Sequence, residues 1–337
     1  MTQAPSNHKL AIVVAAFKSE YLAKALACLT RQTDQRFTLY VLDDASPADI
    51  AGIARSTLGA RPYIYKRFES NLGGKSLAKH WDRCVALCNE PWVWLFSDDD
   101  LMDDNCVEML NKFLETEGDS ADIVRFNAWI VDESDAVTGL HTLHLDSETW
   151  LEYGYGHFMD WRRTFMQQLI FRRSAFDGAG GFLDLPLCWG TDDAIVIGLG
   201  RHARRPIRRV PGARMYWRIS RQNITPDRSL SKRKEKLRAI CLFVHWFDSL
   251  LKAPRDHMFP NDDAAFRNAM DRYLVQQVMI EGALPAIANW KLLSSTRVEM
   301  CHGSKTSLIK YILVVGVSDA ITAIGRTAKQ LMGRSGE

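Results

Sequence analysis

Five aspartates lie within eight residues, directly after an apolar run. Residues 92–96 read WVWLF and residues 97–104 read SDDDLMDD. Carboxylates packed this closely repel one another, and a divalent cation offsets the repulsion while it holds phosphate oxygens. Oxygen ligands favour Mg²⁺ or Mn²⁺ among the metals that proteins bind. We therefore expect Asp98, Asp99 and Asp100 to end a buried strand and to face a metal site.

Two other motifs rich in aspartate share part of this pattern. A calcium-binding EF-hand loop needs Gly at its sixth position and Glu at its twelfth. Counted from Asp98, those positions hold Asp103 and Met109, so the calcium loop is excluded. A haloacid-dehalogenase-type phosphatase motif fits residues 98–102 in part, although that family places it on the first strand, and this alternative stays open. Asp103 and Asp104 come just before a predicted helix, so we expect them to cap it.

A second pair of acids, Asp192 and Asp193, opens an apolar helical segment after the sequence WGT. Acids in a first helical turn are favoured by the helix dipole. An acid at the edge of a crevice also suits the role of general base. Spacing alone leaves both interpretations open. Trp189 in the preceding loop is a candidate for stacking on a sugar ring.

The turn NLGGKS at residues 71–76 invites comparison with a phosphate-binding loop. The Walker pattern would need Gly at position 69, which is Glu69, so this is not a P-loop. Two interpretations remain. The glycines let the backbone approach a nucleotide with Lys75 near a phosphate, or the segment is a plain turn.

Strands and helices alternate along the first half of the chain. The run LAIVVAAF is apolar and rich in β-branched residues, which is typical of a strand covered on both faces. Strands are predicted at residues 10–17, 37–44, 63–66, 92–96 and 122–126. Helices are predicted at residues 19–31, with Ser19 as the N-cap, and at 48–58, 77–88 and 105–115. This alternation predicts an α/β fold with a mostly parallel, doubly wound sheet and helices on both faces.

Three predicted strands end in polar residues. Lys18 follows the first strand, Asp43 and Asp44 end the second, and residues 97–100 follow the fourth. Ligands of doubly wound sheets bind beyond the carboxyl ends of the strands. The sequence therefore predicts one polar crevice that these three strand ends share.

The pattern changes along the second half. Short strands and aromatic-rich loops are expected between residues 131 and 225, and helices at residues 231–251, 264–286 and 304–332. We place a domain of residues 8–226, with halves at about 8–127 and 128–226, before a helical extension of residues 227–337. The segment 304–332 is either a packed terminal helix or an interfacial helix near anionic lipid.

Composition excludes several classes of protein. A net charge of +3 is too small to indicate nucleic-acid binding. The seven cysteines are scattered without a C-x-x-C pair, which argues against a zinc site and for a reduced compartment. The first residues, MTQAPSNHK, hold no apolar core of a secretory signal, and the apolar run at residues 311–317 is too short to span a bilayer. We therefore expect a cytoplasmic protein.

Several motifs in order resemble a known family. They are IVVAAF at the first strand, LDDAS at the second, then NLGG, WLFSDDD, GGF, WGTDDAIVIGLGRHA and WRISRQNIT. In this order, over roughly residues 8–226, the chain resembles a family 2 glycosyltransferase with the GT-A fold. Several positions depart from the family pattern: Ser97 replaces the leading aspartate of D-x-D-D, Thr191 the glutamate of G-E-D, and Ser220 a histidine. The turn after the first strand, P-x-Y-N in the family, reads AAFK at residues 15–18, so Lys18 stands in place of the asparagine.

The resemblance implies a role for each matching residue. Asp99 and Asp100 would hold Mn²⁺ or Mg²⁺, Asp192 would be the catalytic base, and Trp189 and Asp193 would contact the acceptor. Asp98 would face the ribose and Arg218 would neutralise the departing diphosphate. The donor-binding residues implied in this way are Ala15, Phe17, Asp44, Asn71, Gly73, Lys75, Asp98 and Arg218.

The resemblance also implies an activity. It is inverting transfer of a sugar from a nucleotide-diphosphate donor, expected to be a UDP-sugar, to a hydroxyl of a glycan or lipid-linked acceptor. The setting implied is surface polysaccharide or glycolipid assembly, with peripheral association at the cytoplasmic face of the inner membrane. Two alternatives stay open: a catalytically silent GT-A module that binds sugars or proteins, and a metal-dependent phosphatase or nucleotidyltransferase.

Overall fold

A computed structural model describes residues 8–221, 223, 227–258, 262–300, 308–309 and 312–316. These residues divide into two compact units. The sheet unit takes residues up to 157, 161–184 and from 191 to 223, and the helical unit takes residues 158–160, 185–190 and the described residues from 227 onward.

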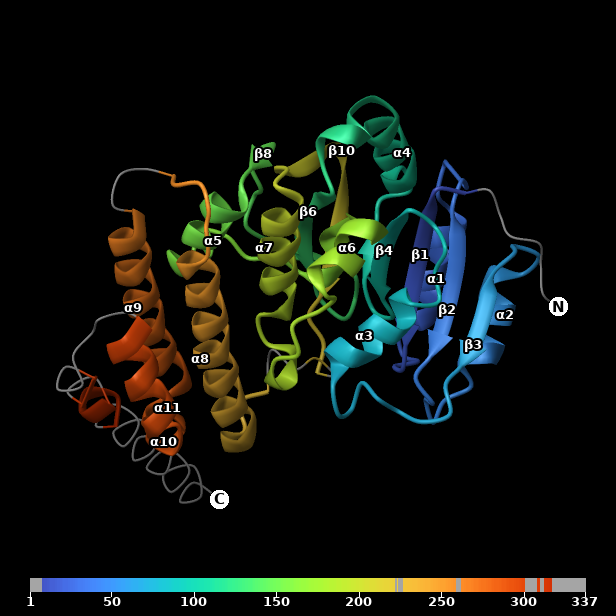
Figure 1. The fold of residues 1–337 in the computed structure, drawn as a ribbon. Helices are drawn as coiled ribbons and strands as arrows, with labels where there is room; N and C mark the ends of the chain where they lie inside the picture. The colour runs from blue at the N-terminus through green and yellow to red at the C-terminus, as the bar shows by residue number, and fades with distance from the viewer. Residues whose placement is uncertain are drawn as a thin grey trace, which may run out of the picture. The chain divides into compact units, whose positions relative to one another are not determined.

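The sheet unit is built on one ten-stranded sheet (Figure 1). Its strand order is β3-β2-β1-β4-β9-β6-β10-β5, with β7 beside β6 and β8 beside β10. The strands β3, β2, β1 and β4 are parallel, whereas β9 runs antiparallel to β4 and β6. The bounds are β1 (Leu10–Ala16), β2 (Thr38–Asp43), β3 (Ile64–Arg67), β4 (Trp92–Ser97), β5 (Leu101–Met102), β6 (Ile123–Val131), β7 (Val137–Leu140), β8 (Ser147–Glu148), β9 (Leu169–Arg172) and β10 (Ile207–Arg218). The predicted α/β architecture is confirmed.

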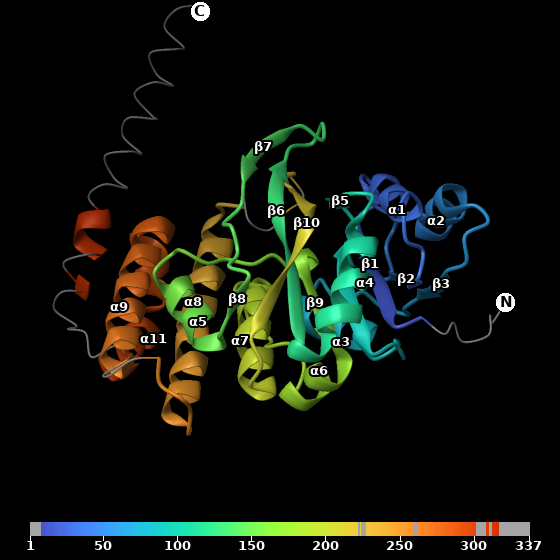
Figure 2. The same cartoon turned by 90° about the horizontal axis from the view of Figure 1, so that it is seen from above.

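Helices cover both faces of this sheet (Figure 2). The apolar sides of α1, α2 and α4 share one buried cluster with alternate residues of β1, β2 and β4. The helices α3, α6 and α7 contact the sheet at β1 and β4, at β9 and at β6, respectively. The bounds are α1 (Leu22–Thr30), α2 (Ile50–Leu58), α3 (Leu77–Val85), α4 (Cys106–Glu117), α5 (Trp150–Phe158), α6 (Arg173–Ala179), α7 (Thr191–Ala203), and the short 3₁₀ turns η1 (Gly118–Ser120) and η2 (Met166–Gln168).

The helical unit packs α8 against α9 and α10. A single helix was predicted over residues 264–286, but the chain breaks at Gly282, whose φ of 91° lies in the left-handed region that glycine tolerates. The bounds are η3 (Pro186–Cys188), α8 (Leu230–Lys252), α9 (Asp262–Glu281), α10 (Ala283–Ala288), α11 (Trp290–Ser295) and the π turn η4 (Thr296–Met300).

The terminal helix predicted at residues 304–332 falls largely outside the described residues, of which only 308–309 and 312–316 belong to it and are helical. Among the helices that the structure describes, none combines the length and the apolar character that crossing a bilayer requires.

Two predictions of helix caps are wrong. The helix α1 begins at Leu22 after Tyr21, without a side-chain cap from Ser19. The helix α4 begins after Asn105, and neither Asp103 nor Asp104 caps it.

Long-range ion pairs explain the second of these differences. Asp103 accepts hydrogen bonds from Arg214 Nε at 3.0 Å and from the Tyr216 hydroxyl at 2.7 Å, both on β10. Asp104 accepts from Arg31 Nε at 3.1 Å. Since β5 pairs with β10 just before α4, the two acids meet cations from distant strands and helices instead of the backbone of α4.

Candidate active site

The end of β1 and the loop after β4 are joined through Asp98. Asp98 Oδ2 accepts the backbone N–H groups of Phe17 at 2.8 Å and Lys18 at 2.6 Å. Asp98 is buried, and burial, with the neighbouring charge of Asp99, raises its pKa to about 6, although Lys18 opposes the rise. At the carboxyl ends of these strands, where a crevice was predicted, the loop after β4 is therefore hydrogen-bonded directly to the turn after β1.

Lys18 places its ammonium between two carboxylates of this loop. Its Nζ contacts Oδ2 of Asp99 and lies 3.5 Å from Oδ1 of Asp98. Burial opposes the charge of Lys18, but Asp98 and Asp99 outweigh this effect and hold its pKa above the ordinary value. The lysine is therefore a fixed positive charge, and its side chain keeps 27% of its surface exposed.

The Asp100 carboxylate is hydrogen-bonded to donors of the protein. Its Oδ1 accepts the backbone N–H of Arg218 at 2.8 Å, and its carboxylate also accepts from the Ser97 hydroxyl. Burial and the charge of Asp99 raise the pKa of Asp100 well above its usual range. Ser97, which replaces an aspartate of the family pattern, thus acts here as a hydrogen-bond donor to its neighbour.

Arg218 connects the end of β10 to residues 98–100, which we call the acidic loop. Its side chain is fully buried, its Nε donates to the Asp99 carbonyl at 2.7 Å, and its Nη1 donates to the Asp132 carbonyl at 2.7 Å. Its Nη2 forms an ion pair with Asp135 at 2.5 Å. The guanidinium of Arg218 is thus paired with acceptors of the protein. The family resemblance had implied that it neutralises a diphosphate.

At the end of β2, Asp44 holds the predicted donor turn. Its carboxylate accepts the backbone N–H groups of Leu72 at 2.9 Å and Gly73 at 2.8 Å, and it contacts Arg83. A Cβ on Gly73 would lie 2.7 Å from Asp44 Oδ2, so glycine is required for this approach. The Asn71 side chain closes the turn by accepting from Gly74 N–H at 2.7 Å.

The other predicted donor residues lie around these contacts. Phe17 is exposed, Ala15 is half-buried near the end of β1, and Lys75 is exposed in the glycine turn. Their roles, and that of Asp44 toward a nucleotide base, stay predictions.

The two acids at the start of α7 have different surroundings. Asp193 is buried, and it accepts from the Tyr153 hydroxyl at 2.5 Å and lies 3.3 Å from His157 Nδ1. Burial opposes its charge, but His157 and Tyr153 lower the pKa of Asp193 below its ordinary value. Asp192 keeps part of its surface exposed. Its carboxyl group is nevertheless poorly solvated, and this loss of solvation, together with repulsion from Asp193, raises its pKa to about 8. Asp193 is therefore the stronger acid of the two and stays charged, whereas Asp192 changes between its neutral and its charged form near pH 8.

The turn η2 links Asp192 to the strand that carries the aspartates. Asp192 accepts a backbone hydrogen bond from Met166, the first residue of η2. The next residue, Gln167, accepts a hydrogen bond from Trp94 Nε1 on β4 at 2.7 Å. The start of α7 is thus positioned on the same strand whose end carries the acidic loop.

Trp189 belongs to the helical unit, where its ring lies 4.6 Å from Lys236 Nζ. This contact covers one face of the indole with a cation. Stacking of Trp189 on a sugar stays a prediction.

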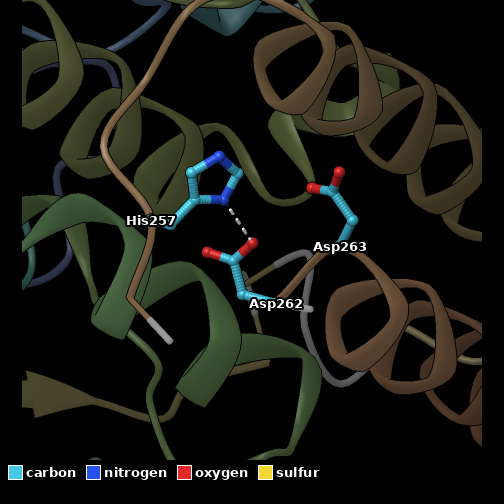
Figure 3. A group of neighbouring side chains, drawn as sticks. All are labelled: His257, Asp262 and Asp263. Carbon is cyan, nitrogen blue, oxygen red and sulfur yellow. Dashed lines mark hydrogen bonds and ion pairs between the residues drawn. The ribbon is translucent and has the colours of Figure 1, made fainter. Parts of the chain in front are cut away.

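A different group has the geometry of metal ligands. Among the His, Cys, Asp and Glu residues that the structure describes, one group of three has ligand atoms that all lie within 4.8 Å of one another (Figure 3). It consists of His257, Asp262 and Asp263. Asp262 accepts from Arg255 Nη1 at 2.9 Å and lies 2.8 Å from His257 Nδ1, while Asp263 also contacts Arg255. Burial opposes its charge, but Arg255 and His257 hold the pKa of Asp262 below its ordinary value. Arg255 already pairs with both acids, so we interpret the group as an ion-pair cluster at the start of α9.

A cavity of about 970 Å³ lies elsewhere on the sheet unit. We call it the β10 cavity; it is lined by residues of β5, β6 and β10, including Trp129, Arg214 and Tyr216, together with Arg31, Asp103 and Asp104. None of Lys18, Asp98, Asp99 or Asp192 lines it.

The predicted site residues therefore come together in part. The acidic loop meets the end of β1 and the end of β10, and Asp44 meets the glycine turn. Sequence reasoning missed the contact of Lys18 with Asp99, and the partners of Asp193 on α5. The signal for Lys18 was present, because a lysine stands where the family pattern has an asparagine.

One comparison with known proteins identifies a family, and another finds structures with a similar fold. Residues 11–177 match the family model described as Glycosyl transferase family 2. Crystal structures of Staphylococcus aureus TarS 1–349 are similar: the complex with UDP-GlcNAc has a TM-score of 0.55 at 15% identity and covers 86% of this chain and 90% of that chain. The complex with UDP has a TM-score of 0.51 at 16% identity, covering 87% and 88%. No curated protein matches the sequence.

Proposed function

Since the chain belongs to glycosyl transferase family 2, we propose that it transfers a sugar from a UDP-sugar to a hydroxyl of a glycan or lipid-linked acceptor. The contact of the β1 turn, at Phe17 and Lys18, with Asp98 carries this proposal. It sets polar groups at the carboxyl edge of a parallel sheet, where ligands of such sheets bind. The similar TarS structures contain UDP-GlcNAc and UDP, which supports uridine as the base of the donor.

The donor lies along the edge formed by β1, β2 and β4 in this proposal. Ala15 and Phe17 contact the base, Asp98 faces the ribose, and the backbone of the turn at Asn71 and Gly73 approaches the donor. Lys75 is exposed in that turn, and we place it near a phosphate of the donor.

Asp192 is the general base. It removes the proton of the acceptor hydroxyl, whose oxygen attacks the anomeric carbon as the bond from that carbon to the diphosphate oxygen breaks. The electron pair of the broken bond leaves with UDP. One carboxylate base and no covalent intermediate predict inversion at the anomeric carbon. Asp193, held by Tyr153, positions the start of α7 and remains an anion.

The predicted metal ligands fit a divalent cation poorly. Asp98 accepts two backbone N–H groups, Asp99 contacts Lys18, and Asp100 accepts from Arg218 and Ser97. Among the residues that the structure describes, these three do not form a group in which one oxygen from each lies within 4.8 Å of the other two. The proposed transfer therefore uses no Mn²⁺ or Mg²⁺ at Asp99 and Asp100.

The proposed setting is surface polysaccharide or glycolipid assembly in the cytoplasm, with the enzyme at the membrane face. The resemblance of the ordered motifs supports this setting. The catalytically silent alternative predicts donor binding without turnover.

A thermal-shift screen of nucleotides tests the donor. We expect UDP and UDP-sugars to raise the melting temperature more than GDP or ADP, because a ligand at 100 times its Kd adds about 2.7 kcal/mol to the free energy of unfolding. UDP release is then measured for each binding donor with a panel of acceptors. Absence of a shift with every nucleotide would overturn the proposal, and a shift without any turnover would favour the silent module.

The pH dependence of kcat/KM follows from Asp192. The acid must be ionised to accept a proton, and its pKa is raised to about 8. We expect kcat/KM to rise with pH, approaching tenfold per unit below pH 8, and to level off above it. Initial rates of UDP release between pH 5.5 and about 9.5 measure the profile. A rate that is already constant from pH 6 upward would contradict this assignment.

A further inference from the structure

The cation nearest to the acidic loop is a lysine of the protein itself. We propose that the Lys18 ammonium takes the place of a divalent cation in this enzyme, so that it binds the donor diphosphate and stabilises the departing UDP. This inference rests on the proposed function, and it departs from the metal site that the sequence predicted.

The position of Lys18 is fixed by its own backbone. Its N–H donates to Asp98 Oδ2 at 2.6 Å, directly after β1, so the residue starts from a defined point at the edge of the sheet. Its side chain then reaches back to Asp99, and its Nζ lies 3.5 Å from the other oxygen of Asp98. An ammonium thus occupies the space between two carboxylates, as a bound metal ion would.

Other carboxylate oxygens of the loop accept from donors of the protein. Asp98 Oδ2 accepts two backbone N–H groups, and Asp100 accepts from the Arg218 backbone and from Ser97. A divalent ion that binds Asp99 through the oxygen that Lys18 contacts would have to displace the lysine. The sequence change from aspartate to Ser97 removes a further carboxylate that the family pattern places here.

Arg218 is the other cation at the loop, and its contacts differ from those of Lys18. The Arg218 side chain has no exposed surface, and its N–H groups reach the Asp99 and Asp132 carbonyls and Asp135. Lys18 keeps 27% of its side-chain surface exposed. Of these two cations, Lys18 is therefore the one that a diphosphate at the edge of β1 can contact.

The chemistry needs no extra reactant. When the bond from the anomeric carbon to oxygen breaks, its electron pair stays on the β-phosphate of UDP. The Lys18 ammonium donates hydrogen bonds to the phosphate oxygens as their charge grows, and it keeps its proton. The acceptor proton goes to Asp192. The flexible stem of lysine lets the ammonium turn from Asp99 toward the phosphate.

The test compares metal dependence with the charge at position 18. Binding of UDP to the full chain is measured by calorimetry in metal-free buffer with EDTA, and again with Mn²⁺ or Mg²⁺. We expect the Kd for UDP to be the same in both. The Lys18→Met variant keeps an apolar stem without the charge, and we expect it to weaken UDP binding by about 10- to 100-fold, as loss of a charge-assisted hydrogen bond predicts.

Two controls separate a direct role from a structural one. Uridine lacks the phosphates, so its binding, followed by ligand-observed NMR, should be unchanged in Lys18→Met. Lys112→Ala removes an exposed lysine that pairs with Glu108 on α4, and it should leave UDP binding unchanged. If Lys18→Met fails to fold, a requirement of wild-type UDP binding for Mn²⁺ or Mg²⁺ would still overturn the role of Lys18.

Each outcome points to one conclusion. UDP binding that requires Mn²⁺ or Mg²⁺ would overturn the role of Lys18 and leave the proposed function standing. Equal loss of uridine and UDP binding in Lys18→Met would also overturn it, since the lysine would then act on the fold of the site. Absence of nucleotide binding under every condition would instead overturn the proposed function.

Discussion

Replacing Asp192 with Asn is expected to lower kcat for sugar transfer by about 100- to 10,000-fold, the usual contribution of a general base. The amide keeps the shape of the side chain but does not accept the acceptor's proton. Asp193 does not replace it, because that carboxylate is buried against Tyr153 and His157. The affinity for UDP should be unchanged, since the proposed donor contacts lie at the ends of β1 and β4 and in the turn at Asn71 and Gly73. Initial rates and UDP calorimetry on the same preparation measure both quantities.

The neighbouring acid supplies a matched control. Asp193→Asn removes the anion that accepts from the Tyr153 hydroxyl, so we expect it to lower the melting temperature, whereas Asp192→Asn should not. The folded state holds the pKa of Asp192 above its ordinary value, so its ionised form destabilises the fold at high pH. Asp192→Asn should therefore be at least as stable as the wild type at pH 9. Wild-type turnover in Asp192→Asn would contradict its role as the base.

Replacing Glu148 with Gln is expected to lower the free energy of unfolding of the sheet unit by about 3–5 kcal/mol, the usual cost of leaving one charge of a buried pair unpaired. Glu148 on β8 contacts Nη2 of Arg125 on β6, and Arg125 has no exposed surface. Glu148 also accepts from Arg162 Nε at 3.2 Å. A neutral amide leaves the charge of Arg125 buried without its anion.

Chemical unfolding followed by tryptophan fluorescence measures this effect as a shift in the transition midpoint. Glu115→Gln is the control, because Glu115 pairs with Arg36 at the surface, where its side chain is 54% exposed. We expect that change to alter stability by less than about 1 kcal/mol. A midpoint for Glu148→Gln no lower than that for Glu115→Gln would show that the buried pair contributes nothing.

Local patterns predicted the strands well and the caps poorly. The run at β1 is apolar and covered on both faces, and this property is visible within a few residues. The partners of Asp103 are not visible locally, since Arg214 lies 111 residues away along the chain. The break at Gly282 had a local signal, a glycine inside a helical pattern, but the prediction of one helix over residues 264–286 did not use it.

The candidate site shows the same division. Strand ends located the acidic loop, because polar residues after buried strands must lie at the edge of the sheet. The type of cation there depends on Lys18, whose side chain meets an acid 81 residues away. Likewise, spacing left Asp192 and Asp193 equivalent, and the difference comes from Tyr153 and His157 on another helix.

A crystal structure of the protein with UDP tests the central claim most directly. We predict the diphosphate within hydrogen-bonding distance of the Lys18 ammonium, with the uracil beside Phe17 at the carboxyl edge of β1 and β2. UDP in the β10 cavity, between Trp129 and Tyr216, would contradict the assignment of the donor site to the acidic loop.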